Sequence, residues 1–162
     1  ARTRQGRKSS TRFLIVDAQS VKNTDSAGEK ISGIKHHIAV DTQGLPHAIA
    51  VTTADVTDRK GALLALGRCA ADLQAVQRIL ADGGYVGQPF AQAVEELLGA
   101  KVQIAKRSEL HTFAVMPQRW VVERSFAWIE KCRRLWKNCE RKLNNSLQFI
   151  HPAFLSLLLR RS

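Results

Sequence analysis

Three acidic residues, Asp17, Asp82 and Glu123, are placed where carboxylates could act together. Residues 12–17 and 75–82 are predicted to form short buried strands, each ending at its aspartate, and Glu123 falls in a segment predicted to be helical. Carboxylate oxygens are hard ligands, and three that converge are a usual way to hold one or two Mg²⁺ ions beside phosphate oxygens. The chemistry that these residues indicate is metal-assisted phosphoryl transfer.

The helix that presents Glu123 is predicted to begin at Pro117 and to continue past Arg141, because neither Gly nor Pro interrupts it. At about 100° per residue, its charged and apolar side chains separate onto opposite faces. The charged face carries Arg119, Glu130 and Arg134 beside the glutamate, and the apolar face carries Val121, Trp128, Ile129, Cys132, Leu135 and Trp136. A solvated Glu123 that pairs with Arg119 is the alternative interpretation.

Other polar residues compete for a place at such a site. Glu95 and Glu96 also lie in a predicted helix, but they follow the second aspartate too closely and lack cationic neighbours. His36 and His37 are adjacent in a predicted strand, so their side chains point to opposite faces and do not easily serve one metal ion. Thr57 or Asp58 is expected to cap a helix, and a place for Asp58 near the metal ions is the alternative.

The composition predicts a basic domain that binds nucleic acid. A chain of 162 residues is long enough for one buried core, and its net charge of +11 implies an anionic partner. Residues 1–11 are predicted to be a flexible basic arm and residues 12–162 the folded domain. The three cysteines include no C-x-x-C pair, so reduced thiols are expected. No apolar run is long enough to cross a bilayer, which predicts a soluble cytoplasmic protein without a membrane partner.

In its motifs the chain resembles the DDE transposases of bacterial insertion sequences, in the group with a compact ribonuclease-H-like catalytic domain. The matching segments follow the family's order and are residues 16–22, 35–45, 54–58, 80–85 and 119–128. Carried over by position, the family's two aspartates are Asp17 and Asp82, its glutamate is Glu123, and Arg119 is the arginine one turn earlier. The resemblance also implies a helical DNA-binding segment ahead of this domain, and none is recognisable in the sequence.

The chain departs from the family pattern at a few positions. Related transposases often carry a Tyr where this chain has Met116, and a Lys where it has Glu130, with Lys131 one residue later. His36 stands at the middle of a triplet that is often Lys-Arg-His in close relatives. None of these changes touches the three carboxylates.

The predicted fold is α/β, a ribonuclease-H-like mixed five-stranded sheet whose first three strands are antiparallel, flanked by helices. Residues 34–40 and 47–53 are expected to form a hairpin, with Asp41 at the first position and Gly44 at the last position of a type I turn. In the resembled plan the strands of the two aspartates are neighbours, and the glutamate comes in from the side.

The resemblance implies a transposase catalytic domain that cleaves transposon-end DNA and transfers the strand to target DNA. Two Mg²⁺ or Mn²⁺ ions about 4 Å apart would be held by the three carboxylates. The expected partners are double-stranded DNA, from transposon ends and target, and further copies of the chain on that DNA. The candidate DNA-binding residues are Arg119, Arg124, Lys131, Arg134, Lys22 and Lys35. A hydrolysis-only nuclease and a catalytically silent DNA-binding remnant are the alternatives.

Overall fold

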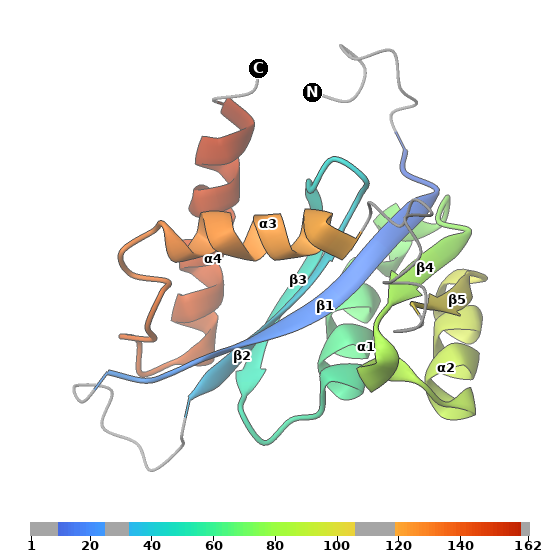
Figure 1. The fold of residues 1–162 in the computed structure, drawn as a ribbon, viewed down its shortest axis with the longest axis horizontal. Coiled ribbons are helices and arrows are strands. Elements are labelled where there is room, and N and C mark those ends of the chain that lie inside the picture. Colours follow the sequence, from blue (N-terminus) through green and yellow to red (C-terminus); the bar gives the residue numbers. More distant parts are fainter. Residues whose placement is uncertain (1–9, 25–32, 106–118, 160–162) are drawn as a thin grey trace.

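A mixed five-stranded sheet with helices on both faces forms the centre of the computed structural model, which describes residues 10–24, 33–105 and 119–159 (Figure 1). The sheet has the order β3-β2-β1-β4-β5, in which β1 pairs antiparallel with β2 and parallel with β4. The strands are β1 (Phe13–Val21), β2 (Ile34–Val40), β3 (Pro46–Thr53), β4 (Arg78–Ala81) and β5 (Lys101–Ile104). This arrangement confirms the predicted sheet, including its three antiparallel strands. Residues 1–9 of the predicted arm lie outside the described residues.

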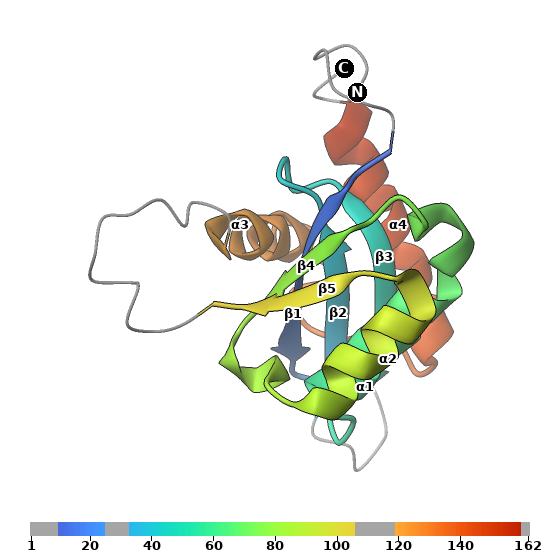
Figure 2. The same ribbon diagram turned by 90° about the vertical axis from the view of Figure 1, so that its right-hand side faces the viewer.

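The helices divide between the two faces of the sheet (Figure 2). They are α1 (Asp58–Arg68), α2 (Gln88–Leu98), α3 (Arg119–Glu130) and α4 (Leu143–Leu159), with short 3₁₀ turns η3 (Ala70–Leu73) and η4 (Gly83–Tyr85). Alternation along β1 determines which residues each face receives. Leu14 and Val16 pack in the core with α1 and α2, whereas Ile15 packs in the core with α3 and α4. Asp17 is two residues after Ile15, so it belongs to the same face of the sheet, which α3 covers.

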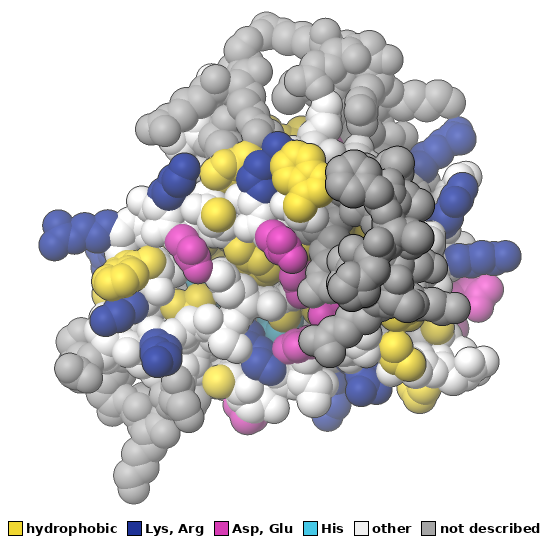
Figure 3. Space-filling model, in the orientation of Figure 1, with side chains coloured by type: hydrophobic (Ala, Val, Ile, Leu, Met, Phe, Trp, Pro, Cys, Tyr) yellow, Lys and Arg dark blue, Asp and Glu magenta, His cyan; other side chains and the backbone are white. Residues whose placement is uncertain are grey.

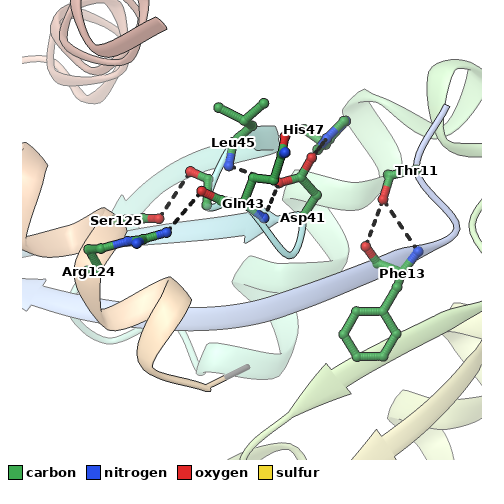
Figure 4. Close-up of polar contacts among 9 residues, drawn as sticks. Thr11, Phe13, Asp41, Gln43, Leu45, His47, Arg124 and Ser125 are labelled. Carbon is green, nitrogen blue, oxygen red and sulfur yellow. Dashed lines mark hydrogen bonds and ion pairs between the residues drawn. The ribbon is translucent and has the colours of Figure 1, made fainter. Parts of the chain in front are cut away.

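The β2–β3 hairpin is held by the turn chemistry expected of Asp41. Its carboxylate accepts hydrogen bonds from the backbone N–H groups of Gln43 at 2.8 Å and Leu45 at 3.1 Å (Figure 4). The N–H of Gly44 donates to the Asp41 carbonyl at 2.9 Å, and Gly44 has φ +81°, which glycine adopts without strain. The hairpin thus presents a rigid turn to α3, where Ser125 donates to the Gly44 carbonyl.

The first strand is longer than predicted, so Asp17 lies in mid-strand rather than at a strand end. β1 continues to Val21, and its last residues pair with β2 down to Ile34. The strand was predicted to end at Asp17, and the residues after it are polar. In the structure, however, every second residue after Asp17 still faces the α3 side of the sheet. Val21 is buried with the α3 and α4 core, and Gln19 on the same face bonds to α3. Long-range pairing therefore overrides the local polarity.

The single long helix predicted through Arg141 is wrong, because α3 ends at Glu130 and α4 begins only at Leu143. Asn138 holds the intervening segment against the end of β1. Its backbone N–H donates to the Lys22 carbonyl at 2.9 Å, and its side chain bonds Asn23 at 2.8 Å and accepts from Ser146 at 2.8 Å. The contacts with Lys22 and Asn23 join residues more than 100 positions apart, and they replace the helical hydrogen bonds that the local sequence favours.

Candidate active site

Asp17 and Asp82 lie at the same level of two neighbouring parallel strands. The register pairs Ile15 of β1 with Leu80 of β4. Asp17 follows Ile15 by two residues, and Asp82 follows Leu80 by two residues. Because both steps are even, both side chains belong to the face of the sheet that α3 covers. The two aspartates and Val122 of α3 line one small cavity, together with apolar residues. Folding thus brings together two acids that are 65 positions apart in the sequence.

Backbone donors orient one oxygen of each aspartate. The Asp17 Oδ1 accepts a hydrogen bond from the N–H of Ala18 at 2.8 Å, and the Asp82 Oδ1 accepts one from the N–H of Gly84 at 2.8 Å. Asp82 acts here as the N-cap of η4. Both side chains are half-buried. Such bonds restrict the rotation of each carboxylate, which prepares it as a ligand.

Helix α3 brings the third acid to the same region without completing a metal site. Glu123 follows the cavity-lining Val122 and is exposed, in a stripe with Ala127 and Glu130 at i, i+4 and i+7. Acidic side chains gather in the middle of the face shown in Figure 3, with basic side chains around them. In the described part of the chain, however, no three His, Cys, Asp or Glu side chains are arranged to hold one metal ion.

The donor set nonetheless fits a divalent cation such as Mg²⁺ or Mn²⁺. Two aspartates on adjacent strands supply hard oxygen ligands, and their juxtaposed negative charges are unfavourable without a counter-charge. Asp17 and Asp82 would hold the ion, and Glu123 would complete the set by a movement of its side chain or of α3. The described cysteines are free thiols at scattered positions, which gives no alternative soft-ligand site.

A tyrosine hydroxyl lies behind the aspartates. Tyr85 is 1% exposed, and its hydroxyl has no hydrogen-bond partner among the described residues. Burial, followed by the negative charges of Asp17, Asp58 and Asp82, raises the pKa of Tyr85 well above its ordinary value. The phenol is therefore neutral at physiological pH, within the electrostatic reach of three carboxylates.

Lys35, one of the predicted DNA contacts, pairs with Asp58. The Lys35 ammonium donates to Asp58 at 3.0 Å and to the Val56 carbonyl at 2.9 Å. Thr57 caps α1 by accepting from the Lys60 N–H, which confirms one of the two caps considered for this helix. The Lys35 side chain is thus engaged in joining β2 to the start of α1.

The paired histidines are buried on opposite faces, as predicted. The His37 ring bonds the Thr52 hydroxyl at 2.8 Å on the α1 side. The His36 ring lies on the other side, and neither of its nitrogens has a hydrogen-bond partner in the described structure. Burial lowers the pKa of His36 to about 4, with a smaller contribution from His37. Both histidines are accordingly neutral core residues at pH 7.

The basic residues predicted to contact DNA fall into two groups. Lys22 and Lys131 are exposed, and the Arg119 side chain lies outside what the structure describes. Arg124 lies between two indoles, 4.3 Å from the Trp120 ring centroid and 4.9 Å from that of Trp128, and donates to the Gln43 carbonyl (Figure 4). Arg134 pairs with Glu140 and covers the Phe149 ring. Several of the predicted DNA contacts therefore have intramolecular partners.

A second cavity lies away from the acids. It has a volume of about 440 Å³ and opens between β3 and α4. Apolar residues such as Ile49 and Phe154 line it, with His47 and His151 at its margin. No carboxylate lines this cavity.

None of the helices in the described ranges is long and apolar enough to span a membrane.

Sequence comparisons relate most of the chain to transposases. Residues 8–159 match a family model described as "Transposase DDE domain". The chain is also 36% identical, over 132 residues, to a Burkholderia cepacia protein named "Putative transposase for insertion sequence element IS402". The aligned region covers 77% of this chain and 60% of that protein, so the chain spans less than two thirds of its relative.

Structural comparisons give the fold of retroviral integrases. A magnesium complex of the HTLV-2 integrase catalytic core domain matches with a TM-score of 0.54 at 17% identity, over 91% of this chain and 85% of that one. A chain of a simian T-cell lymphotropic virus intasome, in complex with a PP2A regulatory subunit, matches with a TM-score of 0.62 at 16% identity. That match covers 91% of this chain and 48% of the intasome chain. The architecture is therefore ribonuclease-H-like, as the predicted strand order implied.

Proposed function

Because the chain belongs to the transposase DDE domain family, we propose that it is the catalytic domain of a transposase, which cleaves transposon-end DNA and transfers the strand to target DNA. The observation that carries this proposal is the position of Asp17 and Asp82 at one level of β1 and β4, with α3 lying over them. The retroviral integrase cores share this fold, and one of them is a magnesium complex.

Each of the three acids has a distinct part in this proposal. Asp17 and Asp82, oriented by the N–H groups of Ala18 and Gly84, hold divalent ions from the sheet. Glu123 completes the ligand set from α3. Two bound Mg²⁺ or Mn²⁺ ions would activate the attacking water or 3′-hydroxyl and stabilise the leaving 3′-oxygen. The carboxylates repel one another, so ion binding and their joint ionisation are coupled.

DNA binding is proposed for the basic surface around this acidic centre. Lys22 and Lys131 are exposed and can reach phosphates directly, and Arg119 precedes Glu123 by one turn. Arg124, Arg134 and Lys35 would reach DNA only by giving up partners inside the protein. With about six phosphates contacted, the affinity would fall with salt at a log-log slope of about −5. A slope near zero would contradict this part of the proposal.

The proposed reaction also implies an oligomeric state and a location in the cell. Both ends of a transposon must be cut and joined together, which requires more than one active site, and an intasome is among the structural relatives. The domain would therefore act as a homo-oligomer on DNA, at the nucleoid in the bacterial cytoplasm. The aligned region covers 60% of the Burkholderia cepacia relative, so this proposal concerns the catalytic domain alone.

A strand-transfer assay with pre-cleaved transposon ends tests the proposed reaction. In Mn²⁺ the protein should join the labelled end to a target plasmid, and Asp82→Asn should abolish joining. Nicked but unjoined products would identify the hydrolysis-only nuclease. A calorimetric titration with Mn²⁺ distinguishes the proposed enzyme from a catalytically silent DNA-binding remnant. The remnant would bind Mn²⁺ no better than its Asp17→Asn variant does.

A further inference from the structure

One side-chain hydrogen bond joins β1, which carries Asp17, to α3, which carries Glu123. The Gln19 Nε2 of β1 donates to the Glu130 Oε1 of α3 at 2.6 Å, across 111 positions of sequence. Gln19 follows Asp17 by two residues, and Glu130 follows Glu123 by seven. A side-chain bond between β1 and α3 therefore lies close to both acids in sequence and in space.

The spacing on each element makes this bond a marker of where α3 lies along β1. Two residues of strand place Gln19 about 7 Å from Asp17 on the same face of the sheet. Seven residues of helix are nearly two turns, so Glu130 and Glu123 share one exposed stripe about 10 Å apart, with the small Ala127 between them. Any sliding or rotation of α3 that moved Glu123 would also move Glu130 away from Gln19.

The Gln19 amide has few other anchors. Its Oε1 is buried and has no hydrogen-bond partner among the described residues. The register places His36 of β2 directly opposite Gln19, and neither nitrogen of that ring has a partner in the described structure either. The described hydrogen bonds of the Gln19 side chain thus reduce to the one with Glu130, which orients the amide toward α3.

We propose that Gln19 and Glu130 are positioning residues, which hold α3 so that Glu123 faces the aspartate pair. This inference rests on the proposed function, because it assigns Glu123 to the metal site. The bond acts by limiting the movement of α3 to the small displacement that completes the ligand set. Neither residue touches the ion in this assignment, which separates their role from that of a fourth ligand.

The test measures Mn²⁺ affinity by calorimetry in matched variants of the full chain. Gln19→Ala and Glu130→Ala should each weaken Mn²⁺ binding about 5-fold, less than the roughly 10- to 100-fold typical of groups that bond a metal ligand directly. Glu130→Gln keeps an acceptor for the Gln19 amide and should bind Mn²⁺ as the wild type does. The exposed Glu96→Ala on α2 is the surface control.

Two further variants make the outcomes decisive. The double variant Gln19→Ala/Glu130→Ala should bind Mn²⁺ about as well as either single variant, because both remove the same bond. Glu123→Gln should weaken binding more than any of them.

If Glu123→Gln has no effect, the proposed ligand set is wrong. If it weakens binding while Gln19→Ala and Glu130→Ala do not, only the positioning role is overturned. A loss in Glu130→Gln equal to that in Glu130→Ala would also overturn it, since charge alone would then explain the effect.

Discussion

Asp17 in the middle of β1 and Asp82 just after β4 lie two residues beyond a paired position of neighbouring parallel strands, on one face of the sheet. Adjacent strands are about 4.8 Å apart, so two negative charges are held close together by the backbone itself. This juxtaposition of charges favours the binding of a cation, and it depends on the whole β1–β4 connection, which contains β2, β3 and α1.

The first prediction separates stability from metal binding. Asp17→Asn keeps an oxygen that accepts from the Ala18 N–H but removes one of two adjacent charges. In metal-free buffer it should raise the free energy of unfolding by about 0.5–1 kcal/mol, the size of a like-charge cross-strand pair. It should also abolish the stabilisation of the wild type by Mn²⁺. Urea denaturation with and without Mn²⁺ measures both effects.

The control for this change is Asp72→Asn, at an exposed position of η3. It should alter neither the metal-free stability nor the response to Mn²⁺. A wild-type protein that gains no stability from Mn²⁺, or an Asp17→Asn variant that gains as much as the wild type, would contradict the assignment of this acid.

The second prediction concerns two glycines of one helix. A Cβ at Gly61 would lie 2.1 Å from the His37 ring, whereas a Cβ at Gly67 would meet nothing within 4 Å. Gly61→Ala should therefore destabilise the fold by about 1–3 kcal/mol through overpacking. Gly67→Ala should stabilise it by up to about 1 kcal/mol, because alanine favours the helix. Thermal unfolding of the two variants measures the opposite signs, and equal signs would refute the close approach of α1 to β2.

The third prediction uses the pH dependence that a buried histidine creates. Burial lowers the pKa of His36 from 6.5 to about 4, so the unfolded chain binds a proton in this range before the folded protein does. Stability that is present above pH 6.5 is therefore lost as the pH falls toward 4, by up to about 3 kcal/mol for this residue. His36→Leu should reduce this loss.

Leucine suits the site because neither His36 nitrogen has a hydrogen-bond partner among the described residues. Chemical denaturation at intervals between pH 4 and pH 7 gives the slope for each variant. The exposed His151→Leu is the control and should leave the slope unchanged. A His36→Leu slope as steep as that of the wild type would show that this ring is not the group that titrates.

The fourth prediction distinguishes an arginine inside the protein from one on its surface. Arg124 stacks between Trp120 and Trp128 and donates to the Gln43 carbonyl. Arg124→Lys keeps the charge but loses the planar group, and it should cost about 1–2 kcal/mol of stability. Arg133→Lys, at an exposed position, should stay within about 0.5 kcal/mol. Urea unfolding of both variants measures the difference, and an unchanged Arg124→Lys would contradict the stacking.

Local sequence predicted the elements whose signals are short in range. The β2–β3 hairpin follows from Asp41 and Gly44 in its turn, and α2 (Gln88–Leu98) is the helix that was predicted to carry Glu95 and Glu96. The break after Glu130 was not predictable in the same way. It depends on Asn138 meeting Asn23, a contact that no helical propensity encodes.

The sequence predicted the strands that precede the two candidate aspartates, but it did not predict the partners of the basic residues. The apolar residues before Asp17 and Asp82 indicated strands, and the resembled plan implied that those strands are neighbours, as β1 and β4 are. Charge counting marked Arg134 and Lys35 as phosphate contacts, but spacing along the chain does not reveal which acid lies nearby in space. The structure pairs them with Glu140 and Asp58. Gln19 was missed because the first strand was expected to end at Asp17, two residues before it.

The most direct measurement is the anomalous difference density of a crystal soaked in Mn²⁺. The account predicts a peak between the carboxylates of Asp17 and Asp82, with Glu123 turned toward it from α3. No peak at that position, or a peak whose ligands exclude both aspartates, would contradict the account.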